Sequence, residues 1–116
     1  MIVSKHDYYV YIVTNKTNTV LYTGVTNDLL QRVIEHFLNR KNNKSFTGRY
    51  RCYLLLYYES FKYVRDAIAR EKQIKAWSRL QKIRLILEFN PNWEALNSEL
   101  FGRWPPENMF HRKDVT

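Results

Sequence analysis

Two short runs of aromatic and β-branched residues near the start of the chain restrict its fold more than any other feature. The runs YYVYIVT at residues 8–14 and VLYTGVT at residues 20–26 are typical of β-strands, and the polar segment NKTN between them is typical of a turn. Together they predict a β-hairpin. Gly24 lies inside the second run, where a glycine packs nothing and costs conformational entropy, so it indicates a close approach by another group.

The pairing of this hairpin brings two tyrosines close to the glycine. If the hairpin is symmetric about Lys16 and Thr17, Tyr11 lies directly opposite Tyr22, and Gly24 shares their face. Cross-strand tyrosines often stack on each other without any further role. The pair alone therefore does not indicate a functional site.

The remaining elements follow in a compact order. Asp28 is a favourable N-cap for a helix, and Ser78 with Gln81 forms the capping-box pattern that begins another. The run CYLLLYYES at residues 52–60 is typical of a strand that is buried on both faces. We expect helices over residues 29–38, 63–76, 78–89 and 93–100, a polar basic loop over residues 39–51, and an irregular or docking tail from residue 101.

The composition indicates one domain with a basic surface. Of the 116 residues, 45% are hydrophobic, which suffices for a core, and the net charge of +8 favours a polyanionic partner such as nucleic acid. No apolar run approaches the roughly 18 residues of a membrane-spanning helix, and the N-terminal MIVSKHD does not resemble a signal peptide. A single cysteine, Cys52, cannot form an intrachain disulfide. These features lead us to expect a cytoplasmic protein with no membrane partner.

Three charged or titratable residues on the predicted helices are candidates for a site. Arg32 and His36 lie on one stripe at the rim of the apolar face of their helix, where an arginine next to Gly24 suits a phosphate. Glu71 falls near the centre of an apolar helical stripe. A carboxylate there needs a partner, which is either Lys75 one turn further on or a divalent metal ion.

The order and spacing of these residues resemble the GIY-YIG nuclease family. The similarity is carried by YVY at residues 9–11, YTG at residues 22–24, Arg32 with His36, and the later segments AREKQIKAW and NPNW. It covers about residues 7–96 and is greatest for small single-domain bacterial members, which are similar to the N-terminal nuclease module of the excision-repair subunit. Tyr9 stands where the first motif has glycine, and Thr23 where the second has isoleucine.

The resemblance implies an α+β fold, a three-stranded antiparallel sheet flanked by helices, with a nuclease domain at residues 1–96 and a tail at residues 97–116. It also implies a DNA endonuclease that uses one divalent cation, Mg²⁺ or Mn²⁺, and serves DNA repair or recombination. Gly24 would then keep the tyrosines open to the substrate or the metal. By resemblance, the catalytic residues are Tyr11, Tyr22, Arg32, His36 and the metal ligand Glu71, with either Tyr11 or His36 as the base.

Contacts with nucleic acid are expected mainly from basic side chains. A solvated helix face explains some of these charges equally well, but Phe46, Tyr50 and Trp77 lie among them and can stack on unpaired bases. We therefore expect branched or single-stranded DNA to be preferred over intact duplex. A non-catalytic nucleic-acid-binding module and a protein-interaction domain with an acidic partner remain alternatives. The candidate nucleic-acid contacts are Gly24, Lys44, Arg49, Arg70, Lys72, Lys75, Arg79 and Asn90.

Overall fold

A three-stranded antiparallel sheet forms the centre of the protein, described for residues 7–106 in a computed structural model. Its strands are β1 (Tyr8–Thr14), β2 (Leu21–Thr26) and β3 (Leu54–Phe61), in the order β2-β1-β3. Because β1 lies between the other two, its residues from Tyr9 to Thr14 are buried. The predicted α+β fold and its three strands are confirmed.

The register of the hairpin differs from the predicted one by two residues. Gly24, and not Tyr22, lies opposite Tyr11, while Tyr22 pairs with Val13. The turn is longer than NKTN because the side chain of Asn15 accepts hydrogen bonds from the backbone N–H groups of residues 19 and 20, at 2.9 and 3.2 Å. A shift of two residues keeps every side chain on its face. Tyr11, Tyr22 and Gly24 therefore share one face, as expected, although the two tyrosines are not directly opposite each other.

A β-bulge in β3 explains how its run of apolar residues serves both faces. Ile12 of β1 pairs with Tyr57 and Val13 pairs with Leu55, which leaves Leu56 as an extra residue. Leu55 joins the core on one face of the sheet, and Leu56 and Tyr57 join the core on the other. The prediction of a strand buried on both faces is confirmed.

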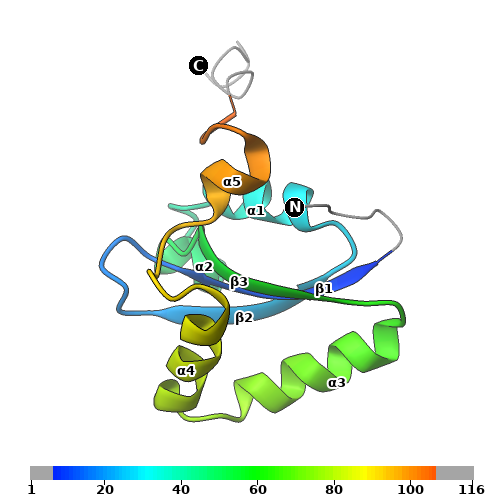
Figure 1. Cartoon of the computed structure of the whole chain (residues 1–116). Helices are drawn as coiled ribbons and strands as arrows, with labels where there is room; N and C mark the ends of the chain where they lie inside the picture. The colour runs from blue at the N-terminus through cyan, green and yellow to red at the C-terminus, as the bar shows by residue number, and fades with distance from the viewer. Residues whose placement is uncertain (1–6, 107–116) are drawn as a thin grey trace.

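Helices cover both faces of the sheet (Figure 1). Helix α1 (Leu29–Leu38) lies on the face of Tyr11, while α3 (Val64–Lys75) and α4 (Arg79–Phe89) cover the opposite face. The Asp28 side chain accepts a hydrogen bond from the Gln31 N–H, and Ser78 and Gln81 form the full capping box, so the predicted starts of α1 and α4 are confirmed. Among the described residues, none of the helices is long and apolar enough to cross a membrane.

Two short helices depart from the predicted elements. Helix α2 (Phe46–Arg49) interrupts the predicted loop, and the side chain of Ser45 caps it by accepting a hydrogen bond from the Gly48 N–H. Helix α5 (Asn97–Phe101) begins later than the predicted helix at residues 93–100. Helix α2 is only four residues long, so its sequence shows no helical period, and Ser45 alone does not predict a helix.

The first part of the predicted tail packs against the sheet rather than extending from it. Leu100, Phe101 and Trp104 contact the core on the α1 face. The buried Asn97 side chain accepts a hydrogen bond from the Leu55 N–H at 2.8 Å and donates one to the Tyr53 carbonyl at 2.9 Å. Of the two forms expected for the tail from residue 101, docking describes Phe101 and Trp104. Residues 107–116 lie outside the described part of the chain, and the division at residue 96 stays a prediction.

Candidate active site

A buried chain of hydrogen bonds joins the central strand to α1 and α2. The Tyr11 hydroxyl lies 2.7 Å from His36 Nε2, and His36 Nδ1 lies 3.1 Å from the Thr47 hydroxyl. Tyr11 is fully buried in the middle of the sheet, and His36 is only 5% exposed. Both side chains are therefore held in one orientation by their packing.

Burial sets the protonation state of both groups. It raises the pKa of Tyr11 to about 12 and lowers the pKa of His36 to about 4, the latter with help from the positive charge of Arg32. At neutral pH both groups are uncharged. Arg32 Nε donates to the Tyr11 oxygen at 3.3 Å, so the Tyr11 O–H donates to His36 Nε2 and the protonated Nδ1 of His36 donates to Thr47.

The glycine of the second motif makes room for the Tyr11 ring. A Cβ atom on Gly24 would lie 2.5 Å from the Tyr11 hydroxyl oxygen and 2.6 Å from Cζ, well inside van der Waals contact. Gly24 is itself buried. The expectation that it clears a path for substrate or metal is thus corrected, because the group that approaches Gly24 is Tyr11 itself.

Arg32 forms the boundary between the buried chain and solvent. Its side chain is 43% exposed, and besides Tyr11 it contacts the Glu35 carboxylate at 3.1 Å. This ion pair within α1 is exposed and therefore weak. The exposed part of the guanidinium is accessible to an anion in solvent. This position suits the predicted contact with a phosphate.

Helix α3, on the face of the sheet opposite α1, brings Glu71 and Lys75 close to Tyr22 at the edge formed by β2. Glu71 is 15% exposed and forms an ion pair with Lys75 at 3.0 Å. Lys75 Nζ lies 5.7 Å from the centre of the Tyr22 ring, and that ring lies 5.9 Å from the ring of His36. The Glu71 carboxylate is also close enough to contribute to the raised pKa of Tyr11. The structure therefore brings together all five predicted catalytic residues at the β2 edge.

The donor set at this edge fits a magnesium-type ion held partly by a substrate. Within residues 7–106, no group of three or more His, Cys, Asp or Glu side chains could enclose a metal. Mg²⁺ is commonly held by one or two carboxylates together with waters and substrate phosphates, so a single carboxylate is compatible with it. Glu71 is the carboxylate next to Tyr11 and Tyr22 that could serve. Its ion pair with Lys75 matches the other alternative that its sequence position allowed.

The predicted nucleic-acid contacts fall into two groups. Lys44, Arg49 and Lys72 are exposed, and Lys75 is half exposed beside Tyr22. These side chains are accessible to a polyanion.

The other four predicted contacts are Gly24, which is buried against the Tyr11 ring, and Arg70, Arg79 and Asn90, which bond other parts of the chain. Arg70 forms an ion pair with Glu59 at 2.6 Å, and Arg79 donates to the carbonyls of residues 18 and 19 in the β1–β2 loop. Asn90 is only 6% exposed, and its amide bonds the Leu56 carbonyl and the backbone of residue 94. As placed, the Asn90 amide stabilises the chain after α4 and is not available to a ligand.

Two residues of the site were not found from the sequence. Thr47, on α2, forms a hydrogen bond with His36. Glu35, on α1 like Arg32, accepts a hydrogen bond from the Arg32 guanidinium. The spacing of Arg32 and Glu35 by one helical turn is a signal that could have indicated their pairing. Thr47 had no such signal, because its helix was not predicted.

The fold and this site together define a GIY-YIG domain. The family model of the GIY-YIG catalytic domain matches residues 7–84, and the chain belongs to this family of nucleases. A UPF0213 protein of Staphylococcus haemolyticus is 40% identical over 85 residues, which cover 73% of this chain and 98% of that protein. A UPF0213 protein of Bacillus pumilus is 34% identical over 91 residues, covering 78% of this chain and 90% of that protein.

A solved structure has the same architecture. The solution NMR structure of a UPF0213 protein from Bacillus halodurans aligns with a TM-score of 0.50 and 28% sequence identity. The alignment covers 79% of this chain and 95% of that one. The resemblance to small single-domain bacterial members of the family is thereby confirmed.

Proposed function

We propose that this protein is an endonuclease that hydrolyses DNA phosphodiester bonds with the help of one divalent cation, Mg²⁺ or Mn²⁺. The observation that carries the proposal is the convergence of Tyr11, His36 and Arg32 with Tyr22 and Glu71 at one edge of the sheet. These residues come from two strands and from helices on opposite faces. A purely structural role gives no reason for such different polar groups to meet there.

Arg32 supplies the positive charge at the substrate. Its exposed guanidinium would bind a non-bridging oxygen of the scissile phosphate and stabilise the charge that develops there. The same side chain covers the Tyr11 hydroxyl. Movement of the guanidinium onto the phosphate would therefore also open this hydroxyl to the attacking water.

Tyr11 and His36 act as one proton acceptor. Neither is a suitable base alone, because the pKa of Tyr11 is raised to about 12 and that of His36 is lowered to about 4. Through the 2.7 Å hydrogen bond, the Tyr11 oxygen can take a proton from water while its own proton passes to His36 Nε2. Thr47 holds the imidazole in the tautomer that this transfer requires.

Glu71 is the proposed metal ligand. A divalent cation bound there and to substrate phosphate oxygens would compensate negative charge at the phosphate and at the leaving oxygen. Lys75, which pairs with Glu71, is close to Tyr22 and can bind a neighbouring phosphate.

A plasmid-nicking assay with Mg²⁺, Mn²⁺ or EDTA tests the activity. Glu71→Gln preserves the size of the side chain and removes its charge, so we expect loss of cleavage with DNA affinity nearly unchanged. Glu88→Gln, at an exposed glutamate of α4, is the matched control and should cleave normally. Full cleavage by Glu71→Gln would refute the metal assignment. A large drop of its melting temperature would instead indicate that the ion pair with Lys75 is structural.

Two further variants separate the phosphate and proton roles. Arg32→Ala should lower the cleavage rate by orders of magnitude with little loss of binding, and Tyr11→Phe should lower it about 10²- to 10⁴-fold. An unchanged rate and pH profile in Tyr11→Phe would contradict the proton transfer. If the protein binds DNA but cleaves it with neither Mg²⁺ nor Mn²⁺, the result would support the alternative, a non-catalytic module of the same fold. A role in DNA repair would follow from a preference for branched substrates over intact duplex.

A further inference from the structure

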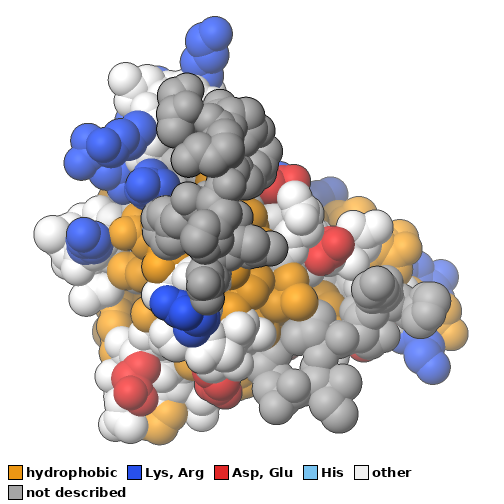
Figure 2. All heavy atoms as spheres, turned by 90° about the horizontal axis from the view of Figure 1, so that it is seen from above, with side chains coloured by type: hydrophobic (Ala, Val, Ile, Leu, Met, Phe, Trp, Pro, Cys, Tyr) orange, Lys and Arg blue, Asp and Glu red, His pale blue; other side chains and the backbone are white. Residues whose placement is uncertain are grey.

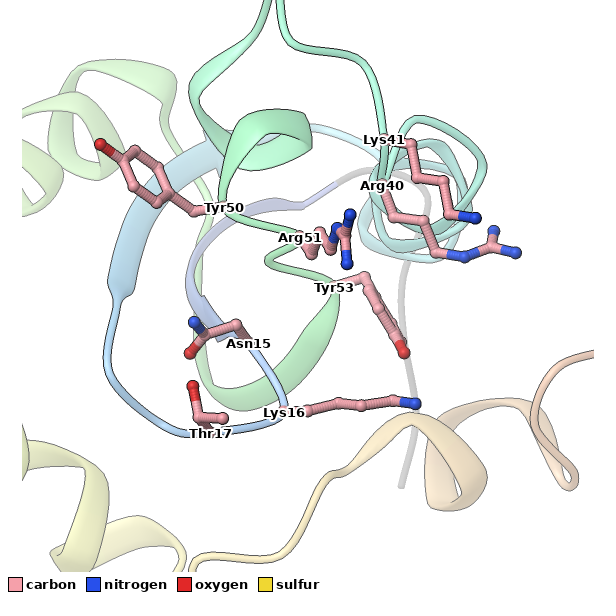
Figure 3. A pocket seen from close by; sticks show the side chains of 8 residues that line it. All are labelled: Asn15, Lys16, Thr17, Arg40, Lys41, Tyr50, Arg51 and Tyr53. Carbon is pink, nitrogen blue, oxygen red and sulfur yellow. The ribbon is translucent and has the colours of Figure 1, made fainter.

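A second basic site lies at the end of the sheet near the β1–β2 loop. A cavity of about 360 Å³ opens there between the loop at residues 15–17, the segment after α1 and the residues that lead from α2 into β3 (Figure 3). Its volume falls in the range of pockets that hold small ligands. Four of its eight lining residues are cationic and none is acidic, the cations being Lys16, Arg40, Lys41 and Arg51.

None of these cations forms an ion pair within residues 7–106. Arg40 lies over the Phe37 ring at 4.0 Å and donates to the Phe37 carbonyl at 2.8 Å, but neither contact neutralises its charge. Lys and Arg side chains gather on the left half of the face in Figure 2, with no acidic side chain among those at the upper left. Like charges gathered around a hollow repel each other, and their combined potential attracts a polyanion.

Arg51 is held in an unusual backbone conformation at the centre of this site. Its φ of 58° is left-handed, which is uncommon for a residue other than glycine. In Figure 3 its side chain and that of Tyr53 lie between Lys16 and the pair Arg40 and Lys41. The turn at Arg51 thus brings a cation from the end of α2 into the cavity.

A path of aromatic rings connects the candidate active site with this cavity. The Tyr22 ring, next to His36, lies 5.8 Å from the Phe46 ring, and Phe46 lies 4.8 Å from Tyr50. Tyr50 lines the cavity. Phe46 is 51% exposed and Tyr50 is 42% exposed, so both rings have surface available for stacking. Aromatic rings bind nucleobases by stacking whatever their sequence, but only when the bases are unpaired.

We propose that the path and the cavity bind a single-stranded DNA segment next to the bond that is cleaved. Its bases stack on Phe46 and Tyr50, and its phosphates bind in the cavity of Lys16, Arg40, Lys41 and Arg51. The proposal rests on the proposed nuclease function for the position of the cleaved bond next to Tyr22. The binding itself is independent of cleavage and can be measured without it.

The stacking is tested by fluorescence anisotropy in EDTA, with a labelled oligothymidylate and a labelled duplex of equal length as probes. We expect Phe46→Ala/Tyr50→Ala to bind the single strand about tenfold or more weakly and the duplex with little change. Phe46→Leu/Tyr50→Leu, which keeps apolar volume next to Thr47, should show the same selective loss. Tyr63→Ala is the control, because Tyr63 is an exposed aromatic residue at the other end of β3. Unchanged single-strand affinity in the leucine variant would overturn the stacking.

The phosphate contacts are tested by the salt dependence of single-strand binding. Each contact with a single strand contributes about −0.7 to the slope of log affinity against log salt, so Lys16→Ala/Arg51→Ala should make the slope shallower by about 1.4. Lys62→Ala/Arg65→Ala removes the same charge beyond the other end of β3 and should leave the slope nearly unchanged. Equal effects of the two double variants would overturn the cavity as a specific site.

The outcomes distinguish the two proposals. If the protein never cleaves DNA but the aromatic variants lose single-strand affinity selectively, the nuclease function fails and the binding site stands. If it cleaves DNA and these variants bind and cleave single-stranded flaps as well as the unchanged protein does, the nuclease function stands and this inference fails.

Discussion

The buried imidazole of His36 should make the protein lose stability in mild acid. Its pKa is lowered to about 4, first by burial and then by the positive charge of Arg32, with Glu35 opposing. Nε2 of the neutral ring accepts a hydrogen bond from the Tyr11 hydroxyl, whereas a protonated imidazole is a donor at both nitrogens. Protonation of His36 therefore removes this hydrogen bond in its present direction and places an unpaired charge in the core.

The size of the effect follows from the difference between the folded and unfolded pKa values. The folded value of about 4 lies below the unfolded value of about 6.5, so the stabilisation is complete above about pH 6.5 and is lost as the pH falls toward 4. In that window the unfolded chain binds a proton that the folded chain does not. At about 1.4 kcal/mol per pH unit, the loss reaches about 3 kcal/mol, a large part of the 5–15 kcal/mol typical of a domain.

Urea unfolding near neutral pH and near pH 4.5, on the unchanged protein and on His36→Gln, measures this contribution. Glutamine does not titrate, while the carboxylates and the other two histidines are common to both proteins and cancel in the comparison. We expect the loss of stability in acid to be about 2–3 kcal/mol smaller in the variant. The same acid loss in both proteins would show that His36 is not held neutral by the fold.

Three other substitutions probe the packing around the site. Asn97→Ala should cost about 2–4 kcal/mol in urea unfolding, because it leaves a buried N–H and a buried carbonyl unpaired; a loss below 1 kcal/mol would contradict this. Thr23→Val should raise stability by about 1 kcal/mol, since the buried Thr23 hydroxyl has no partner within residues 7–106; a lower midpoint would refute it. Gly24→Ala should destabilise by about 1–3 kcal/mol and abolish cleavage by displacing Tyr11, and wild-type melting with full activity would disprove the close contact.

The elements that local signals specify could be predicted from the sequence. Asp28 and Ser78 lie at the starts of two helices because each side chain bonds a backbone N–H within the next turn, which is information contained in a few neighbouring residues. The period of the apolar residues likewise fixes which face of α1 is buried. The candidate site residues are predicted from their spacing and from the family resemblance, and their catalytic roles stay predictions.

The contacts between distant residues could not be predicted in the same way. The hairpin register depends on how the Asn15 side chain organises the turn, and the partner of Gly24 depends on that register. The role of Thr47 depends on α2, which is only one turn long. The sequence position of Glu71 allowed two partners, and only the packing of α3 against the sheet brings its carboxylate close to Tyr11 and its neighbour Lys75 close to Tyr22.

The site combines a buried half and an exposed half that solve different physical problems. In the buried half, packing holds Tyr11 and His36 in a fixed orientation, and burial raises the pKa of Tyr11 and lowers the pKa of His36, so both stay neutral over a wider pH range than in water. In the other half, Arg32 is 43% exposed, and the 15% exposed Glu71 carboxylate pairs with Lys75, which offsets the cost of burying its charge; the proposed phosphate and metal contacts would use these two charges. The edge of a narrow sheet meets both needs, since its central strand is dry and its outer strand is reached by helices from both faces. Thr23, which departs from the family motif, faces α3 on the side of β2 opposite Tyr22 and Gly24, so it does not alter the contacts of Tyr11 with Gly24 and His36.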